Sequence, residues 1–396
     1  MIPAIGAHPV FLEAGRAGEG TFPCESVTAS VRCYTPAQLV QTYGWSAYKN
    51  RGKGQTIVVV DAFQSPTLLQ DLDLEDSTFG LPPADLTVIA PQGLTPWDVD
   101  NQDMMSWSGE ISLDVESIHA YAPGARIILD LAKSDSPADL LAATKYAVDD
   151  DLGSVISMSF GAWEECIPTK LLDEQHGVFV KAVREGISLI ASSGDLGAAQ
   201  VSCSGDSYVL GVSSPASDPD VTSVGGTNVF LASGGGWTGE VAWDDGYGES
   251  GGGISTIYPA PSYQQALGAP ARLVPDVAYN AGVDGGIIIA WGSSGEGAGL
   301  FFDLGGTSAG APAWAALAAL ADQEAGHPLG LLNPKLYRLG ESKRYASYFH
   351  DITIGDNIEG IGGYSTLPGF DLVTGWGTPQ IAALIPALAA TKSVRS

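Results

Sequence analysis

The segment "LGGTSAGAPAWAALAAL", residues 304–320, holds a candidate nucleophile. Gly306, Ser308 and Gly310 fit G-x-S-x-G, the spacing that presents a serine on a tight turn at the start of a helix. An apolar run, "GLFFDL", precedes this motif, and an alanine- and leucine-rich helical pattern follows it. A serine hydroxyl is a poor nucleophile until a base takes its proton. The segment therefore predicts a nucleophilic Ser308 and requires a base elsewhere in the chain.

Histidine is the usual base for such a serine, and the chain has five histidines. None of them lies in a histidine-glycine-threonine turn; they are His8, His119, His176, His327 and His350. The first lies in an irregular N-terminal segment, and the next two fall within helical patterns. We therefore expect ordinary surface or helix histidines, and a base of another kind.

A rival nucleophile is Ser250, because "GESGG" (248–252) also fits G-x-S-x-G. An esterase would combine Ser250 with an acid such as Asp303 and with His327 or His350, the chain order of that fold. That fold needs a strand before the serine and a helix after it. The surrounding segment "DDGYGESGGGISTIYPAPS" is rich in glycine and proline, which break both. The sequence therefore favours Ser308.

Two carboxylates share one face of a helix predicted at residues 107–123. Glu110 and Asp114 are four residues apart, within a pattern whose apolar residues recur at i, i+4 and i+7 (Ile111, Val115 and Ile118). If the pair is buried, its members tend to share a proton, which raises one apparent pKa. Such a pair could serve as the base for a serine. The alternative is a solvated acidic face, which is the usual case at this spacing.

A third candidate carboxyl group belongs to Asp195, in "IASSGDLG" (190–197). Asp195 ends an apolar strand between two glycines, where a loop projects side chains from the carboxyl edge of a parallel sheet. A protonated aspartic acid at this edge could donate a hydrogen bond to a developing oxyanion. The alternative is an aspartate that only ends a strand.

Apolar, β-branched runs alternate with helical patterns after residue 33. The expected strands are 56–63, 125–132, 155–160, 188–195, 220–226 and 300–306, and the expected helices between some of them are 136–151 and 171–186. Near-continuous apolar strands indicate burial on both faces, as in a parallel sheet. The alternation predicts an α/β fold with a mostly parallel central β-sheet and helices on both faces. Residues 232–300 are rich in Gly, Ser and Pro, so we expect long surface loops there.

Acidic residues outnumber basic residues, with 45 Asp and Glu against 18 Lys and Arg, which gives a net charge of −27. Such a surface repels nucleic acid and anionic membranes, so neither is an expected partner. Charge alone leaves open whether this reflects life in acid or simple solubility. No apolar run approaches the roughly 18 residues that span a bilayer, and no signal peptide is visible near the start. We expect residues 1–33 to form an irregular leader and residues 34–396 to form one domain.

The four cysteines lack the C-x-x-C spacing of a zinc site. Two disulfides, Cys24–Cys33 and Cys166–Cys203, are plausible for an exported protein. The alternative is four free, buried thiols.

Several motifs together resemble one known family. "GGTSAGAP" (305–312) resembles the nucleophile segment of subtilisin-like peptidases, "SMSFG" (157–161) their substrate-binding strand, and "TIVVVDAF" (56–63) their first core strand. The histidine turn of subtilisin is replaced by "GEISLDVE" (109–116), which is similar to the E-x-x-x-D helix of the sedolisins, the serine-carboxyl peptidases. "SSGDLG", "SPASDPDVTSVGGT", "SGGGIS" and "RLVPDVAYNA" also follow in sedolisin order.

The resemblance implies a subtilisin-like fold and hydrolysis of peptide bonds at acidic pH. Ser308 would be the nucleophile, Glu110 its base, and Asp114 the residue that orients Glu110. Asp195 would replace the oxyanion-hole asparagine of subtilisin. An acid-rich composition then favours life in acid over generic solubility.

The resemblance also implies one structural calcium ion near the C-terminus, at "FHDITIGDN" and "TLPGFDLVTGWGTP". Calcium takes six to eight oxygen ligands. The side chains of Asp351 and Asp371 and the carbonyl groups of Ile352, Leu367 and Gly369 would supply five, and water the rest. Asp356 lies nearby and is expected to form a turn instead.

The substrate-binding strand that the resemblance implies runs through Ser159, Phe160 and Gly161. Some members extend the triad by hydrogen bonds to a Glu on the first core strand and a Trp on the substrate strand. Asp61 and Phe160 stand at those places here, and a phenylalanine cannot donate such a bond. We therefore expect no such extension.

The resemblance further implies a secreted, extracellular monomer that acts on protein or peptide substrates. The family is made with a long, cleaved N-terminal pro-segment, so we expect a mature or trimmed chain, or a different maturation. Two alternatives to an endopeptidase remain: an exopeptidase of the same family that releases tripeptides, and an inactive relative that binds peptides. All four catalytic positions are filled, which favours an active enzyme.

Overall fold

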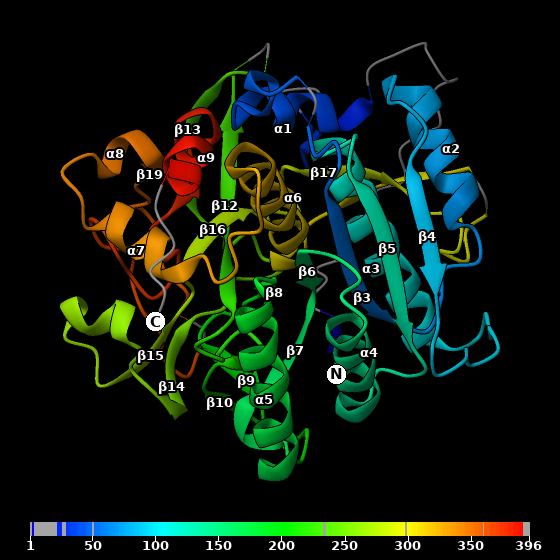
Figure 1. Cartoon of the computed structure of the whole chain (residues 1–396). Coiled ribbons are helices and arrows are strands. Elements are labelled where there is room, and N and C mark those ends of the chain that lie inside the picture. The colour runs from blue at the N-terminus through cyan, green and yellow to red at the C-terminus, as the bar shows by residue number, and fades with distance from the viewer. Residues whose placement is uncertain are drawn as a thin grey trace.

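The computed structural model describes residues 2–3, 22–25, 29–49, 51–232, 235–297, 299–358 and 360–390 (Figure 1). The α-helices of this part are α1 (Pro36–Thr42), α2 (Leu68–Phe79), α3 (Gln102–Tyr121), α4 (Pro137–Asp149), α5 (Thr169–Glu185), α6 (Thr307–Ala325), α7 (Asn333–Gly340), α8 (Tyr345–Tyr348) and α9 (Ile381–Ala390). Short 3₁₀ helices lie at Pro23–Glu25, Trp45–Ala47, Glu164–Cys166 and Ser262–Leu267. The central sheet contains β3 (Thr56–Ala62), β4 (Asp85–Ile89), β5 (Arg126–Ala132), β6 (Val155–Met158), β8 (Ser188–Ser192), β12 (Thr222–Leu231), β13 (Trp237–Ala242) and β16 (Val277–Asn280). The other strands are β1 (Ile2–Pro3), β2 (Cys33–Tyr34), β7 (Phe160–Trp163), β9 (Ala199–Val201), β10 (Tyr208–Leu210), β11 (Ser213–Ser214), β14 (Gly253–Pro259), β15 (Ala271–Val274), β17 (Gly286–Ala290), β18 (Phe301–Leu304), β19 (Phe349–His350) and β20 (Thr378–Pro379).

The central sheet has the strand order β13-β12-β8-β6-β3-β5-β4, and β16 also pairs with β12. Every pair in it is parallel except β12 with β13. The predicted α/β fold with a mostly parallel sheet is therefore confirmed. Parallel strands end together at one edge, so the loops that follow them can build a common site there.

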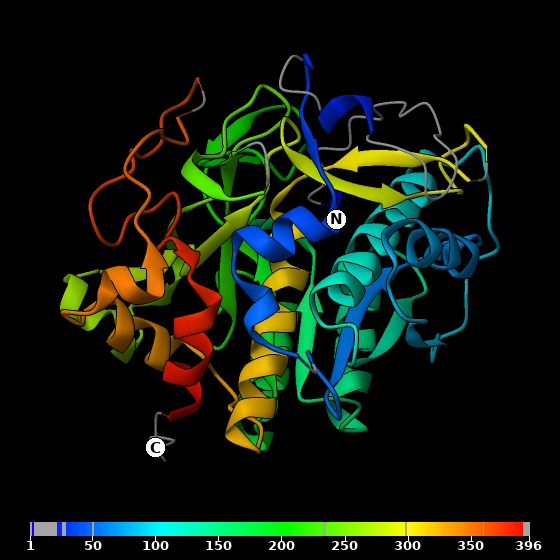
Figure 2. The same ribbon diagram turned by 90° about the horizontal axis from the view of Figure 1, so that it is seen from above.

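Strand β3 shows why both faces of the sheet must be covered. Ile57 and Val59 belong to one hydrophobic core, whereas Val58 and Val60 belong to another. The first core also contains residues of α3, α6 and α9, and the second contains residues of α4 and α5. Because side chains alternate along a strand, an all-apolar strand needs helices on both faces. Helix α9 lies beside α6 in the view from above (Figure 2).

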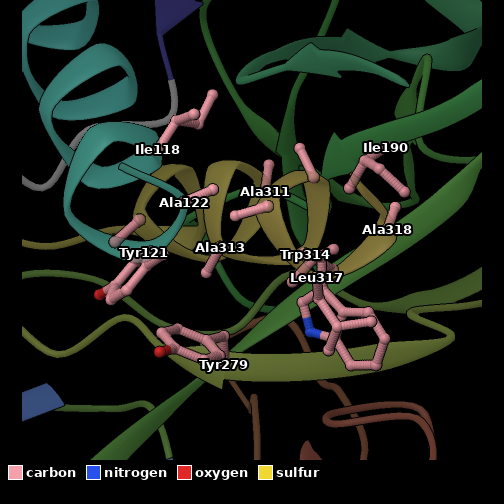
Figure 3. Packing of buried hydrophobic residues seen from close by; sticks show 14 of the residues in the cluster. Ile118, Tyr121, Ala122, Ile190, Tyr279, Ala311, Ala313, Trp314, Leu317 and Ala318 are labelled. Carbon is pink, nitrogen blue, oxygen red and sulfur yellow. The ribbon is translucent and has the colours of Figure 1, made fainter. Parts of the chain in front are cut away.

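Helix α6 packs directly against α3 in the centre of the first core (Figure 3). The small residue Ala311 lies on α6 near α3, Ala318 lies beside Ile190 of β8, and Trp314 fills the space beside β16. The Trp314 indole is fully buried and donates a hydrogen bond of 3.0 Å to the Ala278 carbonyl group. This packing fixes the start of α6 relative to α3.

The expectation of long surface loops at residues 232–300 is wrong. This segment contains β13 to β17, and both β16 and β17 are fully buried strands. The apolar runs "VAYN" and "GIIIA" are short and stand among Gly and Pro residues, so the average composition concealed them. The predicted strand before Ser308 is present as β18, but it pairs antiparallel with β17 outside the central sheet.

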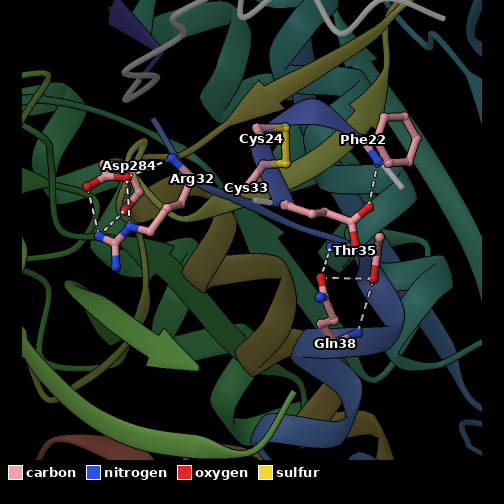
Figure 4. The surroundings of a disulfide bond; sticks show 8 residues. Phe22, Cys24, Arg32, Cys33, Thr35, Gln38 and Asp284 are labelled. Carbon is pink, nitrogen blue, oxygen red and sulfur yellow. Dashed lines mark hydrogen bonds and ion pairs between the residues drawn. A yellow bond between two sulfur atoms is a disulfide. The ribbon is translucent and has the colours of Figure 1, made fainter. Parts of the chain in front are cut away.

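Both predicted disulfides are present, Cys24–Cys33 and Cys166–Cys203. The first ties residues 22–25 to the start of the domain, where Thr35 and Gln38 form a capping box at α1 and Arg32 pairs with Asp284 at 2.7 Å (Figure 4). Most of the leader expected at residues 1–33 lies outside the described residues, so its boundary stays a prediction. Within the described part of the chain, no helix has both the length and the apolar character to cross a bilayer.

Candidate functional site: a serine facing buried carboxyl groups

Ser308 lies in the first turn of α6, as the G-x-S-x-G pattern predicts. Gly306 precedes the helix with φ +102°, a conformation that favours glycine. A Cβ atom on Gly310 would lie 2.8 Å from Val224 Cγ1 of β12, so only glycine lets α6 come this close to the sheet. Ser308 is fully buried beneath the carboxyl ends of the strands.

Helix α3 brings the two carboxylates of the predicted pair to this serine. Asn101 caps the helix by accepting hydrogen bonds from the Asp103 and Met104 amides, at 2.9 and 3.1 Å. From Trp107 to Tyr121 every residue of α3 is buried, and Glu110 and Asp114 have no exposed surface. The alternative of a solvated acidic face is therefore wrong.

The burial of this pair has a strong electrostatic effect. Loss of solvent raises the pKa of Glu110 well above its usual range, and the nearby charges of Asp114 and Asp61 add to the increase. A hydrogen bond from the Ser308 hydroxyl lowers the Glu110 pKa in part. Among the described residues neither Glu110 oxygen has a partner of ordinary hydrogen-bond geometry, so this contact is loose. Catalytic hydrogen bonds are often loose in free enzymes and tighten when substrate binds.

Asp114 is held by a residue of the expected substrate strand. The Ser159 hydroxyl donates a hydrogen bond of 2.8 Å to Asp114 Oδ1 and lies 3.5 Å from the Ser308 carbonyl oxygen. Burial and the charge of Asp61 raise the pKa of Asp114, whereas the Ser159 hydroxyl lowers it. From the sequence, Ser159 is expected only in the substrate strand, so its contact with Asp114 was missed. Its position in "SMSFG" gives no signal for that contact.

Asp61 provides a third buried carboxyl group beside the pair. It lies near the end of β3 without exposed surface, and neither of its oxygens has a hydrogen-bond partner among the described residues. Burial raises the Asp61 pKa to about 8. Three carboxyl groups this close cannot all be ionised, so the cluster holds protons at neutral pH.

Asp195 follows β8 and contacts the residue that precedes the nucleophile. Its Oδ1 atom accepts hydrogen bonds from the Thr307 amide at 2.9 Å and from the Thr307 hydroxyl at 2.6 Å. The Thr307 hydroxyl in turn accepts from the Gly194 amide at 3.1 Å. Because Thr307 directly precedes Ser308, these contacts fix Asp195 relative to the nucleophile. Sequence reasoning missed Thr307, although its place in "GGTSAGAP" was the available signal.

The expected substrate strand, Ser159 to Gly161, leads into β7. Phe160 and Gly161 pair antiparallel with the backbone of Pro3 and Ile2 in β1. The Phe160 side chain is buried against Trp107 of α3, with ring centroids 6.3 Å apart. In this structure β1 itself occupies this edge of β7 as an antiparallel partner.

The expected calcium ligands lie together in a loop region before α9. Asp351 Oδ1 accepts from the Gly369 amide at 3.0 Å, and Asp371 Oδ2 accepts from the Leu367 amide at 3.0 Å. Asp371 is nearly fully buried, which raises its pKa to about 6. The Ile352 carbonyl group follows Asp351 directly. Two carboxylates and neighbouring carbonyl groups form the oxygen donor set that calcium prefers, so these residues fit the ion.

The histidines and Ser250 offer no competing catalytic centre in the described part of the chain. His119 contacts Asp76, His176 contacts Asp218, His327 contacts the carbonyl group of Pro328, and His350 stacks on Trp237; His8 lies outside the described residues. The Ser250 hydroxyl donates to the Val373 carbonyl oxygen at 2.6 Å and accepts from the Gly226 amide. A serine whose proton lies on a peptide carbonyl group has no base.

Comparison with known proteins gives consistent matches. Residues 102–336 match the model of the Subtilase family. Kumamolisin from Bacillus sp. (strain MN-32) is 33% identical over 400 residues, covering 96% of this chain and 68% of kumamolisin. Tripeptidyl-peptidase 1 from Rattus norvegicus is 33% identical over 274 residues, covering 61% of this chain and 44% of that protein.

The fold also matches a solved structure of Pseudomonas sedolisin, a serine-carboxyl proteinase complexed with two molecules of pseudo-iodotyrostatin. The TM-score is 0.79 at 28% identity, and the match covers 90% of this chain and 98% of that one. The sequence match to kumamolisin and the structural match to sedolisin thus extend over nearly the whole chain. The chain belongs to the sedolisin family of subtilisin-fold serine peptidases.

Proposed function

We propose that this protein is an acid-acting serine-carboxyl endopeptidase in which Ser308 attacks the peptide bond and Glu110 takes the serine proton. The observation that carries the proposal is the burial of Glu110 and Asp114 on α3, facing a serine at the start of α6. No histidine contacts this group in the described residues, so the carboxyl pair is the available base.

The proposed reaction has two halves. The Ser308 oxygen forms a bond to the substrate carbonyl carbon, and its proton moves to Glu110 while Asp114 holds the Glu110 side chain in place. Glu110 then gives this proton to the leaving amine as the peptide bond breaks, which leaves an acyl group on Ser308. A water molecule releases the acyl group with Glu110 again acting first as base and then as acid.

Asp195 acts in both halves by donating a hydrogen bond to the oxyanion. Its Oδ1 atom already accepts two hydrogen bonds from Thr307, so Oδ2 is the oxygen that carries the proton. An ionised Asp195 would repel the oxyanion instead of stabilising it. Activity therefore requires acidic conditions, where this proton remains in place.

Substrate residues before the scissile bond would take the place of β1 and pair with the edge of β7 at Phe160 and Gly161. The backbone pairing of β1 with the same two residues supports an extended peptide there.

Calcium would bind Asp351 and Asp371 with the carbonyl groups of Ile352, Leu367 and Gly369, and it would stabilise the loop before α9 without taking part in the reaction. Two disulfides support an extracellular location, and we propose a monomer.

The test is kcat/KM against pH for the wild type, Glu110→Gln and a variant without histidines. A bell-shaped profile on the acid side that survives in the histidine-free variant, and that is lost in Glu110→Gln, supports the carboxyl base. A neutral optimum that vanishes with the histidines would overturn it. Peptides with blocked and free N-termini distinguish an endopeptidase from a tripeptidyl exopeptidase, the alternative suggested by the match to tripeptidyl-peptidase 1.

A further inference from the structure

A second group of buried carboxyl groups lies on a different side of α3 from the catalytic pair. Glu116 follows Asp114 by two residues, and two residues turn an α-helix by roughly half a circle. Neither Glu116 nor Glu75 of α2 has exposed surface, and the charge of Glu75 acts on Glu116. Glu116 Oε2 accepts a hydrogen bond of 2.8 Å from the Ala290 amide of β17. Glu116 Oε1 and both carboxyl oxygens of Glu75 have no hydrogen-bond partner among the described residues.

Helix α2 brings Glu75 to this place on an unusual buried face. The buried residues of α2 recur with helical spacing and are Leu68, Asp71, Leu72 and Glu75, so half of them are acidic. The helix packs against α3 and β17. Asp71 has a partner, because its Oδ2 atom accepts a hydrogen bond of 2.7 Å from the Thr67 hydroxyl. Glu75, one turn further along, has none, although a buried ionised carboxylate without partners is strongly destabilising.

No positive charge compensates Glu75 and Glu116. The other titratable side chains on the surrounding elements are Asp71 and Asp76 on α2, His119 and Tyr121 on α3, and Glu25 in the 3₁₀ helix near the end of α2; β17 has none. The His119 imidazole contacts Asp76 Oδ1 at 2.8 Å, so it is directed to a different carboxylate. Among the described residues, no lysine or arginine forms an ion pair with Glu75 or Glu116.

This environment favours the protonated form of both groups. Burial raises the pKa of Glu75 and that of Glu116 well above the usual range. The charge of Asp76 adds to the increase at Glu75, and the charge of Glu75 adds to the increase at Glu116. A carboxyl group with a raised pKa in the folded state contributes stability that is complete below the ordinary value near 4.3 and is lost as the pH rises through the raised value. The packing of α2 is therefore strongest in acid.

Helix α2 is the element that can move when these protons are lost. It lies outside the central sheet, whereas α3 is held from its other side by α6. Ala290, which bonds to Glu116, is followed by Trp291, whose indole donates a hydrogen bond of 2.9 Å to the Ser108 hydroxyl of α3. The carboxyl group of Glu116 thus joins β17 to the helix that carries the catalytic pair.

We propose that Glu75 and Glu116 form a proton-dependent lock, which holds α2 against α3 and β17 while both carboxyl groups carry their protons and lets α2 open when they ionise. The lock makes the packing around the catalytic helix depend on acid independently of the catalytic residues. This inference goes beyond the proposed function, and its test requires no peptidase activity.

The experiment is amide hydrogen exchange of α2, residues 68–79, measured by mass spectrometry between pH 5 and pH 8 and corrected for the intrinsic pH dependence of exchange. Each group that is protonated in the closed state and ionised in the open state makes opening up to about tenfold more favourable per pH unit. Protection of α2 in the wild type should therefore fall by up to about 100-fold per pH unit. Glu75→Gln and Glu116→Gln should each reduce this fall by about tenfold per pH unit, and together they should nearly abolish it.

The matched control is Asp73→Asn, because Asp73 lies on the same helix but is exposed. It should keep the pH dependence of the wild type. The amides of α4, residues 137–149, are an internal reference, since α4 belongs to the other hydrophobic core and its exchange should not respond to either glutamine. Each glutamine replaces a protonated carboxyl group by a neutral amide of similar shape, and either single variant tests the lock alone. An unchanged pH dependence of α2 in both variants, or an equal response of α2 and α4, would overturn the proposal.

Discussion

The Ser159 hydroxyl lies 2.8 Å from Asp114 Oδ1 and joins the segment that leads into β7 to the carboxyl pair on α3. This bond favours the ionised form of Asp114, so it lowers the Asp114 pKa against the effect of burial. Through Asp114 it also influences the proton shared with Glu110. Ser159 is thus placed to tune the base while its neighbours Phe160 and Gly161 pair with an extended chain.

Replacing Ser159 by alanine should therefore change the pH profile as well as the rate. Without the hydrogen bond the carboxyl pair loses its first proton less easily, so the acidic limb of kcat/KM should move to higher pH. We expect kcat at the optimum to fall by about 10-fold, less than the 10²–10⁴-fold that general acid–base catalysis itself contributes, because Glu110 remains in place.

Ser157→Ala is the matched control, because Ser157 is equally buried on β6 and its hydroxyl has no hydrogen-bond partner among the described residues. It should leave the pH profile unchanged. A Ser159→Ala variant whose limb does not move would show that Ser159 does not act on the carboxyl pair.

Thr307→Val should weaken the positioning of Asp195. The substitution removes the 2.6 Å hydrogen bond to Asp195 Oδ1 and keeps the 2.9 Å bond from the Thr307 amide. We expect kcat to fall by about 10-fold with little change in KM, less than the 10²–10³ typical for loss of an oxyanion donor. Thr144→Val on α4 is the control, since this threonine is also buried and its hydroxyl donates to the Leu140 carbonyl group of its own helix. Equal kcat values in the two variants would contradict the role of Thr307.

The sequence predicted the catalytic core better than the loops, for a physical reason. Residues 56–63 and 102–121 are regular elements whose periodicity reports burial directly, and the short spacing from Glu110 to Asp114 fixes one helix face. The two buried strands within 232–300 are four and five residues long, too short for periodicity to separate them from the surrounding glycines. The contacts from Ser159 to Asp114 and from Glu116 to Ala290 join segments far apart in the chain, and no local pattern encodes such proximity.

Removal of calcium should lower stability if Asp351 and Asp371 bind the ion. A ligand present at 100 times its dissociation constant stabilises the folded state by about 2.7 kcal/mol. Chelation should therefore lower the unfolding temperature measured by calorimetry. Asp371→Asn should lower it similarly and abolish the response to the chelator.

Asp356→Asn should keep that response, because Asp356 Oδ1 accepts from the Ile358 amide of its own turn. An unfolding temperature that does not respond to chelation in the wild type would show that these residues bind no calcium under the conditions used.

Asp130 provides a test of acid adaptation outside the catalytic centre. It is buried on β5, neither oxygen has a hydrogen-bond partner among the described residues, and burial raises its pKa to about 7. A carboxyl group with a raised pKa in the folded state contributes stability that is complete below about pH 4 and is lost as the pH rises through 7. The free energy of unfolding of the wild type should therefore fall by on the order of 3–4 kcal/mol between pH 4 and pH 8 because of this group.

The variant Asp130→Asn should remove that part of the pH dependence in urea unfolding. The control Asp85→Asn, at an exposed position on the adjacent strand β4, should not. Parallel stability curves for the wild type and Asp130→Asn across this range would contradict the prediction, because they would show that ionisation of Asp130 does not destabilise the folded state.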